Sequence, residues 1–239
     1  MLKNNNSMYV LTYNINWKSM EDKTKRKNII SNITNAIDTY NIDILGIQEA
    51  LNWEKILKHI NLKKYDYIHN QSGKEEMITM WNKKKFKNIQ AFTSEFETGR
   101  PFLILILKNK ITNKTICLIN LHAGHNANTK KFIFDIINDK IKNITCDNID
   151  RIIMLGDFNR NIYEDMNVYD YIIINNKKKF KLKTAYSSKN TCCSSVGYGY
   201  KHNYDHILDT IKPLDKNVAE NEWYIKNSSD HLMVIVELV

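Results

Sequence analysis

Residues 151–159 read Arg-Ile-Ile-Met-Leu-Gly-Asp-Phe-Asn, and this segment is the starting point for assigning a fold. Its first five residues form a mostly apolar run of strand length, which ends directly in Gly156-Asp157-Phe158-Asn159. Loops at strand ends are where functional sites usually assemble, because the sheet holds them rigidly. Gly, Asp and Asn also favour ordinary turns, so the motif alone does not separate a site from a turn.

Five other strand-like segments carry polar residues of the same kind at or near their ends. They read Asn14-Ile15-Asn16, Gln48-Glu49, Asn120-Leu121-His122, Tyr204-Asp205-His206 and Ser229-Asp230-His231. Singly, each has a structural explanation: a helix N-terminal carboxylate at Glu49, a buried core histidine at His122 or a turn cap at Asp205. Together, their order and placement favour a site. Asn, Glu, His and Asp are the residues used in metal-assisted hydrolysis of phosphate esters, and Mg²⁺ prefers carboxylate and amide oxygens.

The remaining pattern alternates strands with helices. Short apolar runs predict strands over 9–15, 42–47, 102–107, 115–121, 151–155, 204–208 and 232–239. Apolar residues at helical spacing predict helices over 25–39, 53–60 and 130–144. Residues 65–96 alternate polar and apolar positions, which is typical of antiparallel strands with Lys-rich edges. This mixture indicates a layered α/β protein with sheets inside and helices outside.

The six motifs together resemble the signature of the endonuclease/exonuclease/phosphatase superfamily, which includes pancreatic deoxyribonuclease and tyrosyl-DNA phosphodiesterases. The resemblance runs from Thr12 to Val239. It implies a four-layer α/β sandwich with two central mixed, largely antiparallel β-sheets flanked by helices. Asn14 and His231 would share one site, so residues 1–239 are expected to form a single domain, with 1–7 as a flexible N-terminus. The compact length is closer to the tyrosyl-DNA phosphodiesterase type, although no residue selects it.

The resemblance also implies a metal site. Glu49 would be the main carboxylate ligand of Mg²⁺, for which Mn²⁺ is an expected substitute, with Asn14 beside it and Asp230 nearby, directly or through water. Many members carry an Asp two residues after the first Asn, whereas this chain has Asn16. An amide offers an oxygen but no charge, so weaker metal binding or a single ion is expected.

Five residues take catalytic roles through the same resemblance. Asp157 would orient or deprotonate the attacking water, and Asn159 would hold the phosphate. His231 would donate to a non-bridging oxygen as charge builds, and Asp205 would fix the tautomer of that imidazole. His122 matches a second histidine on the phosphate side.

Five further residues are candidates for substrate contact: Asn16, Trp17, Arg100, Asn120 and His125. Trp17 would stack on a base or a leaving group, or else pack as part of a wall. Arg100 begins a predicted strand and would meet a phosphate or lie on the surface. His125 either touches substrate or faces solvent from a loop.

The charge of this 239-residue chain gives a mild preference for a polyanionic partner. Lys and Arg number 35 against 26 Asp and Glu, for a net charge of +9, with basic clusters at 23–27, 83–85 and 177–179. The chain is also crowded with Lys, Asn and Ile, a bias that an A- and T-rich genome produces without any functional cause.

Three functions therefore compete. The first is a Mg²⁺-dependent phosphodiesterase acting on nucleic acid, as a nuclease or a DNA- or RNA-end processing enzyme. The second is a phosphatase acting on a small phosphate ester or a phosphoinositide. The third is a nucleic-acid-binding module without catalysis, against which the full motif set argues.

The cysteines and the apolar segments suggest where such a protein works. Four cysteines at 117, 146, 192 and 193, with no Cys-x-x-Cys pair, predict reduced thiols and no structural zinc. No apolar run reaches the length of a membrane span, and none of signal-peptide length precedes the first predicted strand. We expect an intracellular monomer, cytoplasmic or nuclear and not secreted.

Overall fold

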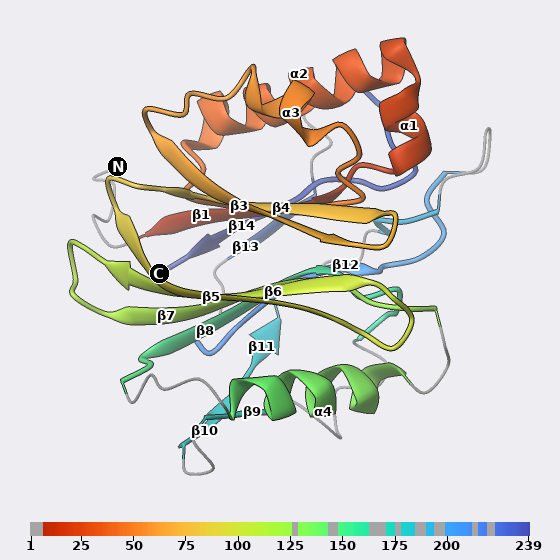
Figure 1. The fold of residues 1–239 in the computed structure, drawn as a ribbon. Coiled ribbons are helices and arrows are strands. Elements are labelled where there is room, and N and C mark those ends of the chain that lie inside the picture. The colour runs from red at the N-terminus through yellow and green to blue at the C-terminus, as the bar shows by residue number, and fades with distance from the viewer. Residues whose placement is uncertain are drawn as a thin grey trace.

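Two six-stranded β-sheets stacked face to face form the centre of the computed structural model (Figure 1). The structure describes residues 7–125, 129–142, 148–162, 171–174, 178–184, 190–193, 199–211, 215–218 and 223–239. The N-terminal segment expected to be flexible, residues 1–7, therefore lies outside the described residues except for Ser7.

The first sheet has the strand order β13-β14-β1-β2-β4-β3. Its strands are β1 (Met8–Asn14), β2 (Ile44–Gln48), β3 (Tyr65–Ser72), β4 (Glu75–Asn82), β13 (Asp215–Val218) and β14 (Val234–Leu238). Strands β1 and β2 are parallel, and the other pairings are antiparallel. The last strand of the chain thus pairs with the first.

The second sheet has the order β11-β12-β8-β7-β6-β5. Its strands are β5 (Phe86–Glu95), β6 (Pro101–Asn109), β7 (Thr115–His122), β8 (Arg151–Asp157), β11 (Lys183–Thr184) and β12 (Asp205–Asp209). Strands β7 and β8 are parallel, and the rest are antiparallel. Both sheets are therefore mixed and largely antiparallel, as expected.

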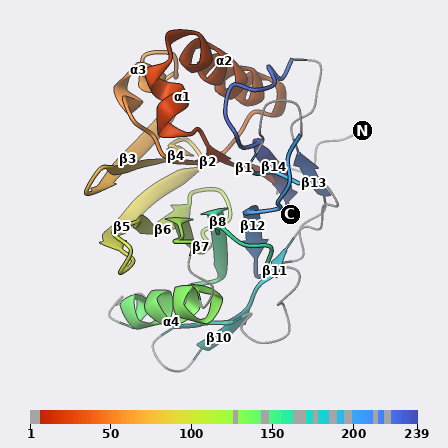
Figure 2. The ribbon, with the colours of Figure 1, turned by 90° about the vertical axis from the view of Figure 1, so that its right-hand side faces the viewer.

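Helices cover the outer faces of the two sheets (Figures 1 and 2). They are α1 (Trp17–Glu21), α2 (Lys23–Tyr40) and α3 (Trp53–Leu57) over the first sheet, and α4 (Thr129–Ile141) over the second. The hairpin of β9 (Tyr171–Ile174) and β10 (Lys178–Lys181) lies beside α4. The predicted four-layer sandwich is confirmed.

Three apolar layers hold the four structural layers together. Ile29 and Ile33, one turn apart on α2, are fully buried against the first sheet. Between the sheets the approach is close: a Cβ on Gly46 would lie 2.0 Å from the Leu155 side chain across the interface. The central strands are covered on both faces, which explains why they read as continuous apolar runs.

Each predicted strand and helix corresponds to an element of the structure, and residues 65–96 hold the antiparallel strands β3, β4 and β5. Helix α3 ends at Leu57, earlier than predicted. Helix α1 escaped prediction because its five residues are too few for a periodic pattern. Among the described residues, no helix combines the length and apolarity needed to cross a membrane.

Candidate active site

Two parallel strand pairs, one in each sheet, bring the motif residues to the same end of the sandwich. Asn14 is in register with Gln48 where β1 and β2 end, and His122 is in register with Asp157 where β7 and β8 end. Strand β12 begins opposite the end of β8, so that Asp205 pairs with Asp157. Residues far apart in the sequence therefore meet at one place, as the motif order predicted.

Gly156 makes the approach of β7 to β8 possible. Its φ is 142°, and a Cβ at this position would lie 1.9 Å from the carbonyl oxygen of Leu121. Only glycine adopts this conformation without strain and leaves room for the neighbouring backbone. The glycine of the Gly-Asp-Phe-Asn motif thus brings Asp157 beside His122.

Asn14 links the two central carboxylates of the site. Its Nδ2 donates to Glu49 Oε1 at 3.0 Å and to Asp157 Oδ2 at 2.9 Å, and its Oδ1 accepts from the backbone N–H of Asn16 at 3.0 Å. The side chain is fully buried. Asn14 therefore lies beside Glu49, as expected, and fixes the spacing between Glu49 and Asp157.

Glu49 is held in an unusual backbone conformation. Its φ is 54°, in the left-handed region that non-glycine residues rarely adopt, and its Oε2 accepts from the backbone N–H of Trp17 at 3.0 Å. Asn16, at φ 55°, caps α1 by accepting from the N–H groups of Lys18 and Ser19. The Asn16 side chain is thus used to start a helix, although substrate contact was expected of it.

His231 and Asp205 form a buried couple. His231 Nδ1 lies 2.9 Å from one Asp205 carboxylate oxygen and 3.2 Å from the other, and its Nε2 lies 3.7 Å from Asp157 Oδ2. The backbone N–H of His231 donates to Ser229 Oγ at 3.1 Å, and that hydroxyl donates to the carbonyl oxygen of Asn14. The C-terminal motif is therefore tied directly to the end of β1.

The charges in this cluster reinforce one another. Burial alone would lower the pKa of His231, but the carboxylates of Asp205 and Asp157 outweigh it and raise the pKa to about 10. Burial would raise the pKa of Asp157, but the imidazoles of His231 and His122 and the hydrogen bond from Asn14 bring it below its ordinary value. The geometry therefore favours a charged imidazolium facing an ionised carboxylate.

His122 occupies the other side of Asp157 and faces a carboxylate that the motifs did not reveal. Its Nε2 lies 3.5 Å from Asp157 Oδ2 and 3.8 Å from Glu49 Oε1. Its Nδ1 lies 3.4 Å from Glu75 Oε2 without forming a hydrogen bond, although the imidazole is almost completely buried. Glu75 begins β4, and His122 lowers its pKa.

The carboxylates of the site suit a divalent cation. Glu49, Glu75 and His122 each offer a ligand atom, and these atoms lie within 4.8 Å of one another. Two carboxylates match the preference of Mg²⁺ or Mn²⁺, and the Nδ1 of His122 faces Glu75 at 3.4 Å without a hydrogen bond. Asp230 lies on the loop beside His231, where its Oδ1 is 3.5 Å from the Ser229 hydroxyl that donates to the carbonyl oxygen of Asn14.

Two asparagines that were assigned to the phosphate or the substrate make internal contacts. Asn159 Nδ2 donates to the carbonyl oxygen of Ala123, and its backbone N–H donates to Asp157 Oδ1, both at 2.7 Å. Asn120 accepts from Gln48 Nε2 at 2.7 Å and donates to Thr79 Oγ1 at 2.9 Å. Asn120 is fully buried and joins the two sheets, so its contacts are structural.

Arg100 and His125 lie together at the edge of the site. Arg100 Nη2 is 3.3 Å from His125 Nε2, and Arg100 Nη1 is buried without a hydrogen-bond partner. The positive charge of Arg100 helps to lower the pKa of Glu75. Burial lowers the pKa of His125, and Arg100 adds to the effect.

The expectation of four reduced cysteines is wrong for one pair. Cys192 and Cys193 form a disulfide between adjacent residues, a pairing that the absence of a Cys-x-x-Cys pair did not reveal. Cys192 Sγ lies 3.4 Å from His231 Nε2. Cys117 is a buried free thiol, as expected, and Cys146 lies outside the described residues.

Comparison with known proteins identifies the family of this chain. Residues 11–212 match the model of the endonuclease/exonuclease/phosphatase family. The chain is also similar to the uncharacterized protein L684 of Acanthamoeba polyphaga mimivirus, at 30% identity over 216 residues. That match covers 81% of this chain and 40% of the viral protein, so the chain spans less than half of that relative.

Solved structures share the fold at low sequence identity. Zebrafish (D. rerio) TDP2 complexed with single-strand DNA product has a TM-score of 0.72 at 13% identity, covering 97% of this chain and 98% of that one. The mannosyl-6-phosphatase of Bacteroides thetaiotaomicron has a TM-score of 0.74 at 20% identity, covering 97% and 99%. ANGEL2, a 2′,3′-cyclic phosphatase, has a TM-score of 0.70 at 16% identity, covering 97% and 95%. At these identities the likeness establishes the fold alone.

Proposed function

The chain belongs to the endonuclease/exonuclease/phosphatase family, and from this premise we propose that it is a metal-dependent phosphodiesterase acting on nucleic acid, as a nuclease or an end-processing enzyme. One observation carries the proposal: the buried His231–Asp205 couple faces Asp157, which Asn14 joins to Glu49. These side chains are of the types that charge stabilisation, proton handling and cation binding would require.

In this proposal, His231 stabilises the developing negative charge and Asp157 orients the attacking water. With its pKa raised to about 10, His231 is an imidazolium at neutral pH, and its Nε2–H donates to a non-bridging phosphoryl oxygen as charge develops there. Asp205 holds the Nδ1–H and thereby the orientation of the ring. Asp157 is ionised, so it accepts a hydrogen bond from the attacking water and orients it.

Glu49 and Glu75, with His122, would hold the cation, for which we propose Mg²⁺ with Mn²⁺ as a substitute. When bound, the cation supplies Lewis-acid stabilisation of the phosphoryl oxygens. Asn14 keeps Glu49 at a fixed distance from Asp157, which separates the cation-binding side of the site from the water-orienting side.

The preference for nucleic acid is supported by charge. The net charge is +9, and Arg100 lies at the edge of the site with a buried, unpartnered Nη1 suited to a phosphate. The structurally similar TDP2 is seen with a single-strand DNA product. The structurally similar mannosyl-6-phosphatase keeps hydrolysis of a small phosphate ester as the second candidate.

The test is hydrolysis with Mg²⁺ across a substrate panel. The panel contains single- and double-stranded DNA, RNA, a 5′-tyrosyl oligonucleotide, inositol phosphates and mannose 6-phosphate. Asp157→Asn and a chelator should each abolish turnover, because the first removes the charge that orients the water and the second removes the cation.

A matched control removes the same charge far from the site. Asp139→Asn, on α4 with a side chain that is 70% exposed, should hydrolyse the panel like the wild type. If the wild type does not exceed Asp157→Asn on any substrate, the enzyme proposal fails. Cleavage of small phosphate esters alone would favour the second candidate, and binding without turnover would favour a non-catalytic module.

Three further expectations stay predictions. We propose that residues 1–239 form a single domain, because the site combines Asn14 with His231 through Ser229. The monomeric state and the cytoplasmic or nuclear location are also predictions. Size-exclusion chromatography with light scattering and imaging of the tagged protein would check them.

A further inference from the structure

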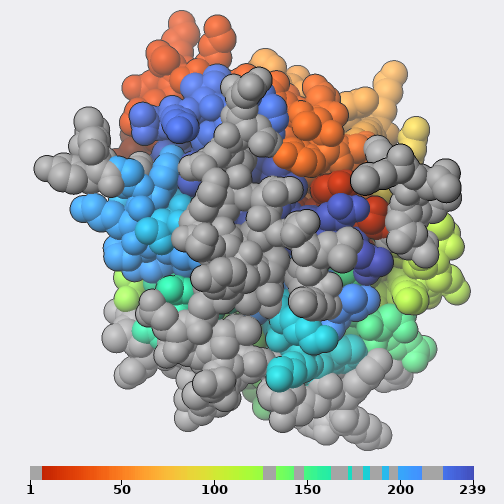
Figure 3. Space-filling view, turned by 180° about the vertical axis from the view of Figure 1, so that it is seen from behind, coloured from red at the N-terminus to blue at the C-terminus, as the bar shows by residue number. Residues whose placement is uncertain are grey.

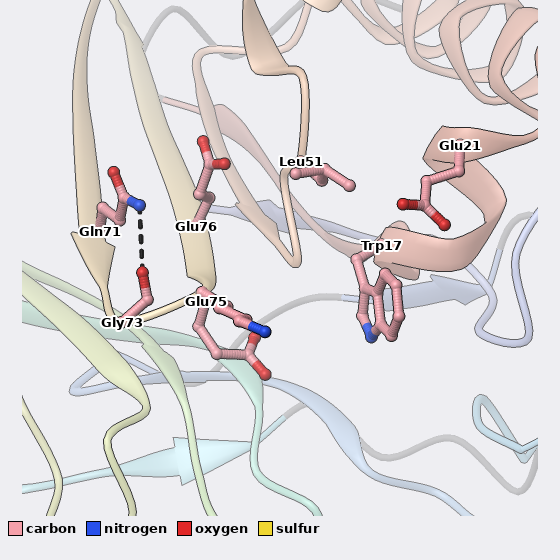
Figure 4. A pocket seen from close by; sticks show the side chains of 8 residues that line it. Trp17, Glu21, Leu51, Gln71, Gly73, Glu75 and Glu76 are labelled. Atoms are coloured by element: carbon pink, nitrogen blue, oxygen red, sulfur yellow. Dashed lines mark hydrogen bonds between the residues drawn. The ribbon is translucent and has the colours of Figure 1, made fainter.

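A cavity of about 600 Å³ lies between the start of α1 and the β3–β4 hairpin (Figure 4). Its walls come from α1, from the loop before α3 and from the hairpin. They consist of Trp17, Glu21, Leu51, Gln71, Gly73, Lys74, Glu75 and Glu76. A volume of this size is enough for one planar ring system together with its sugar.

Two walls of the cavity contact the candidate active site. On the hairpin side, Glu75 Oε2 lies 3.4 Å from His122 Nδ1. On the helix side, the backbone N–H of Trp17 donates to Glu49 Oε2 at 3.0 Å. A group in the cavity would therefore be attached to the phosphate that the site holds, rather than occupy a remote position.

The cavity offers one flat apolar surface. Trp17 is 42% exposed, a large value for tryptophan, and Figure 4 shows its indole standing at the cavity with Leu51 above it. An exposed indole beside a reacting phosphate is suited to stacking against a planar ring.

The polar side of the cavity consists mostly of hydrogen-bond acceptors. Three carboxylates, on Glu21, Glu75 and Glu76, stand against the single ammonium of Lys74. Gln71 Nε2 donates to the carbonyl oxygen of Gly73, which leaves its Oε1 as an acceptor. Such a lining attracts N–H donors and repels an additional phosphate.

A flat apolar surface and a lining of hydrogen-bond acceptors together determine which substituent of a phosphate fits the cavity. Adenine, cytosine and guanine have a π-face and an exocyclic amino group, whereas thymine and uracil present carbonyl oxygens at that position. A tyrosyl ester has a π-face, but its ring oxygen is esterified and no longer donates from the ring. A phosphoinositide has donors, but it brings more phosphates to a lining rich in carboxylates.

We infer that this cavity binds the base of a terminal nucleotide that carries an exocyclic amino group, stacked on Trp17 and hydrogen-bonded to the Glu21 carboxylate. Glu21 is the residue that discriminates between bases. Glu75 and Glu76 face His122 and His69, at 3.4 and 3.0 Å, whereas Figure 4 shows the Glu21 carboxylate directed toward the space beside Trp17. The inference rests on the proposed function, because it assigns the part of the substrate next to the phosphate.

The experiment measures binding apart from turnover. Isothermal titration calorimetry with dAMP, dCMP, dGMP and TMP should show at least about tenfold tighter binding of the three amino-bearing nucleotides, as a hydrogen bond to a charged group provides. Trp17→Ala should weaken binding of all four by about tenfold, and Trp17→Phe should restore most of the loss. Glu21→Gln should reduce the preference over TMP several-fold.

Glu54→Gln is the matched control for Glu21→Gln, because it removes an exposed carboxylate from the first turn of α3 and should keep the preference. Three results would overturn the inference. They are equal affinity for the four nucleotides, tighter binding of mannose 6-phosphate than of dAMP, and an affinity of Trp17→Ala equal to that of the wild type. If the preference is found but no phosphodiester in the panel is hydrolysed, the proposed function fails while the base site stands.

Discussion

Asp205→Asn is the substitution that tests most directly how the site handles charge. The amide oxygen of an asparagine can still accept from His231 Nδ1, which lies 2.9 Å from the carboxylate, but the negative charge is lost. Because Asp205 is the main group that raises the pKa of His231, that pKa should fall from about 10 toward the ordinary 6.5. A difference of this size corresponds to several kcal/mol of preference for the imidazolium.

Two effects on catalysis follow from the sign of this change. In the wild type His231 stays protonated until the pH approaches 10, so the alkaline limit of activity should lie there. In Asp205→Asn the imidazole loses its proton at lower pH, and the limit should move in that direction. Near pH 8 the loss of a positioned charge donor should reduce kcat by on the order of 100- to 1,000-fold.

The assay is the initial rate of phosphodiester hydrolysis at saturating Mg²⁺, followed from below pH 6.5 to above pH 10 so that both limits fall inside the range. Circular dichroism and thermal melting show whether each variant is folded, and Asp139→Asn serves as the exposed control. A variant that keeps the alkaline limit of the wild type, or loses less than about tenfold in kcat, would refute the coupling of Asp205 to His231.

Three other substitutions probe cation binding and packing. Glu49→Gln should raise the Mg²⁺ concentration for half-maximal activity by at least about tenfold, measured by metal titration after treatment with a chelator; an unchanged titration would exclude Glu49 as a ligand. Asp209→Asn leaves the buried Arg151 guanidinium without its bidentate partner, so the free energy of unfolding in urea should fall by about 3–5 kcal/mol. Activity should be retained in the folded fraction. A urea midpoint of unfolding equal to that of the wild type would contradict this expectation. Gly156→Ala places a methyl group 1.9 Å from the Leu121 carbonyl oxygen at φ 142°, so it should cost more than about 1 kcal/mol; a melting temperature equal to the wild type would show that β7 and β8 separate easily.

The strands could be predicted from the sequence because strands that are buried on both faces consist mainly of apolar residues. Val10, Leu11 and Tyr13 are fully buried, since β1 is covered by helices on one face and by the second sheet on the other. A strand in that position reads as a mostly apolar run, although β1 also holds the buried Thr12, and its end is marked by a larger polar group. Asn14 is that group, which is why the position of a site residue could be predicted together with the strand.

Contacts that depend on how the two sheets stack could not be predicted from the sequence. Asn120 and His122 are two residues apart on β7 and therefore point to the same face. Asn120 lies deeper and meets Gln48 and Thr79 of the first sheet, whereas His122 at the strand end meets Asp157. Only the packing of one sheet on the other separates a structural asparagine from a site histidine within one motif.

Glu75 is a site residue whose position could not be predicted from the sequence. It begins β4, in a region that predicts antiparallel strands and has no motif, and it reaches His122 only because the first sheet lies over β7. Its neighbour Glu76 pairs with His69 on β3, so the sequence Glu-Glu gives no sign of which carboxylate faces the site. Alternation along a strand separates their directions once the register is known.

Asn16 stands where many members of the family have a carboxylate, and its contacts show which structural role the asparagine has in this chain. Asn16 adopts φ 55°, where asparagine is favoured over most residues, and its side chain caps α1 at Lys18 and Ser19. That cap sets the direction in which the helix leaves β1, and so places Trp17 at the cavity with its N–H on Glu49. The second carboxylate beside Glu49 then comes from Glu75 on another strand. Asn16 therefore caps the helix whose first residue, Trp17, stands at the cavity.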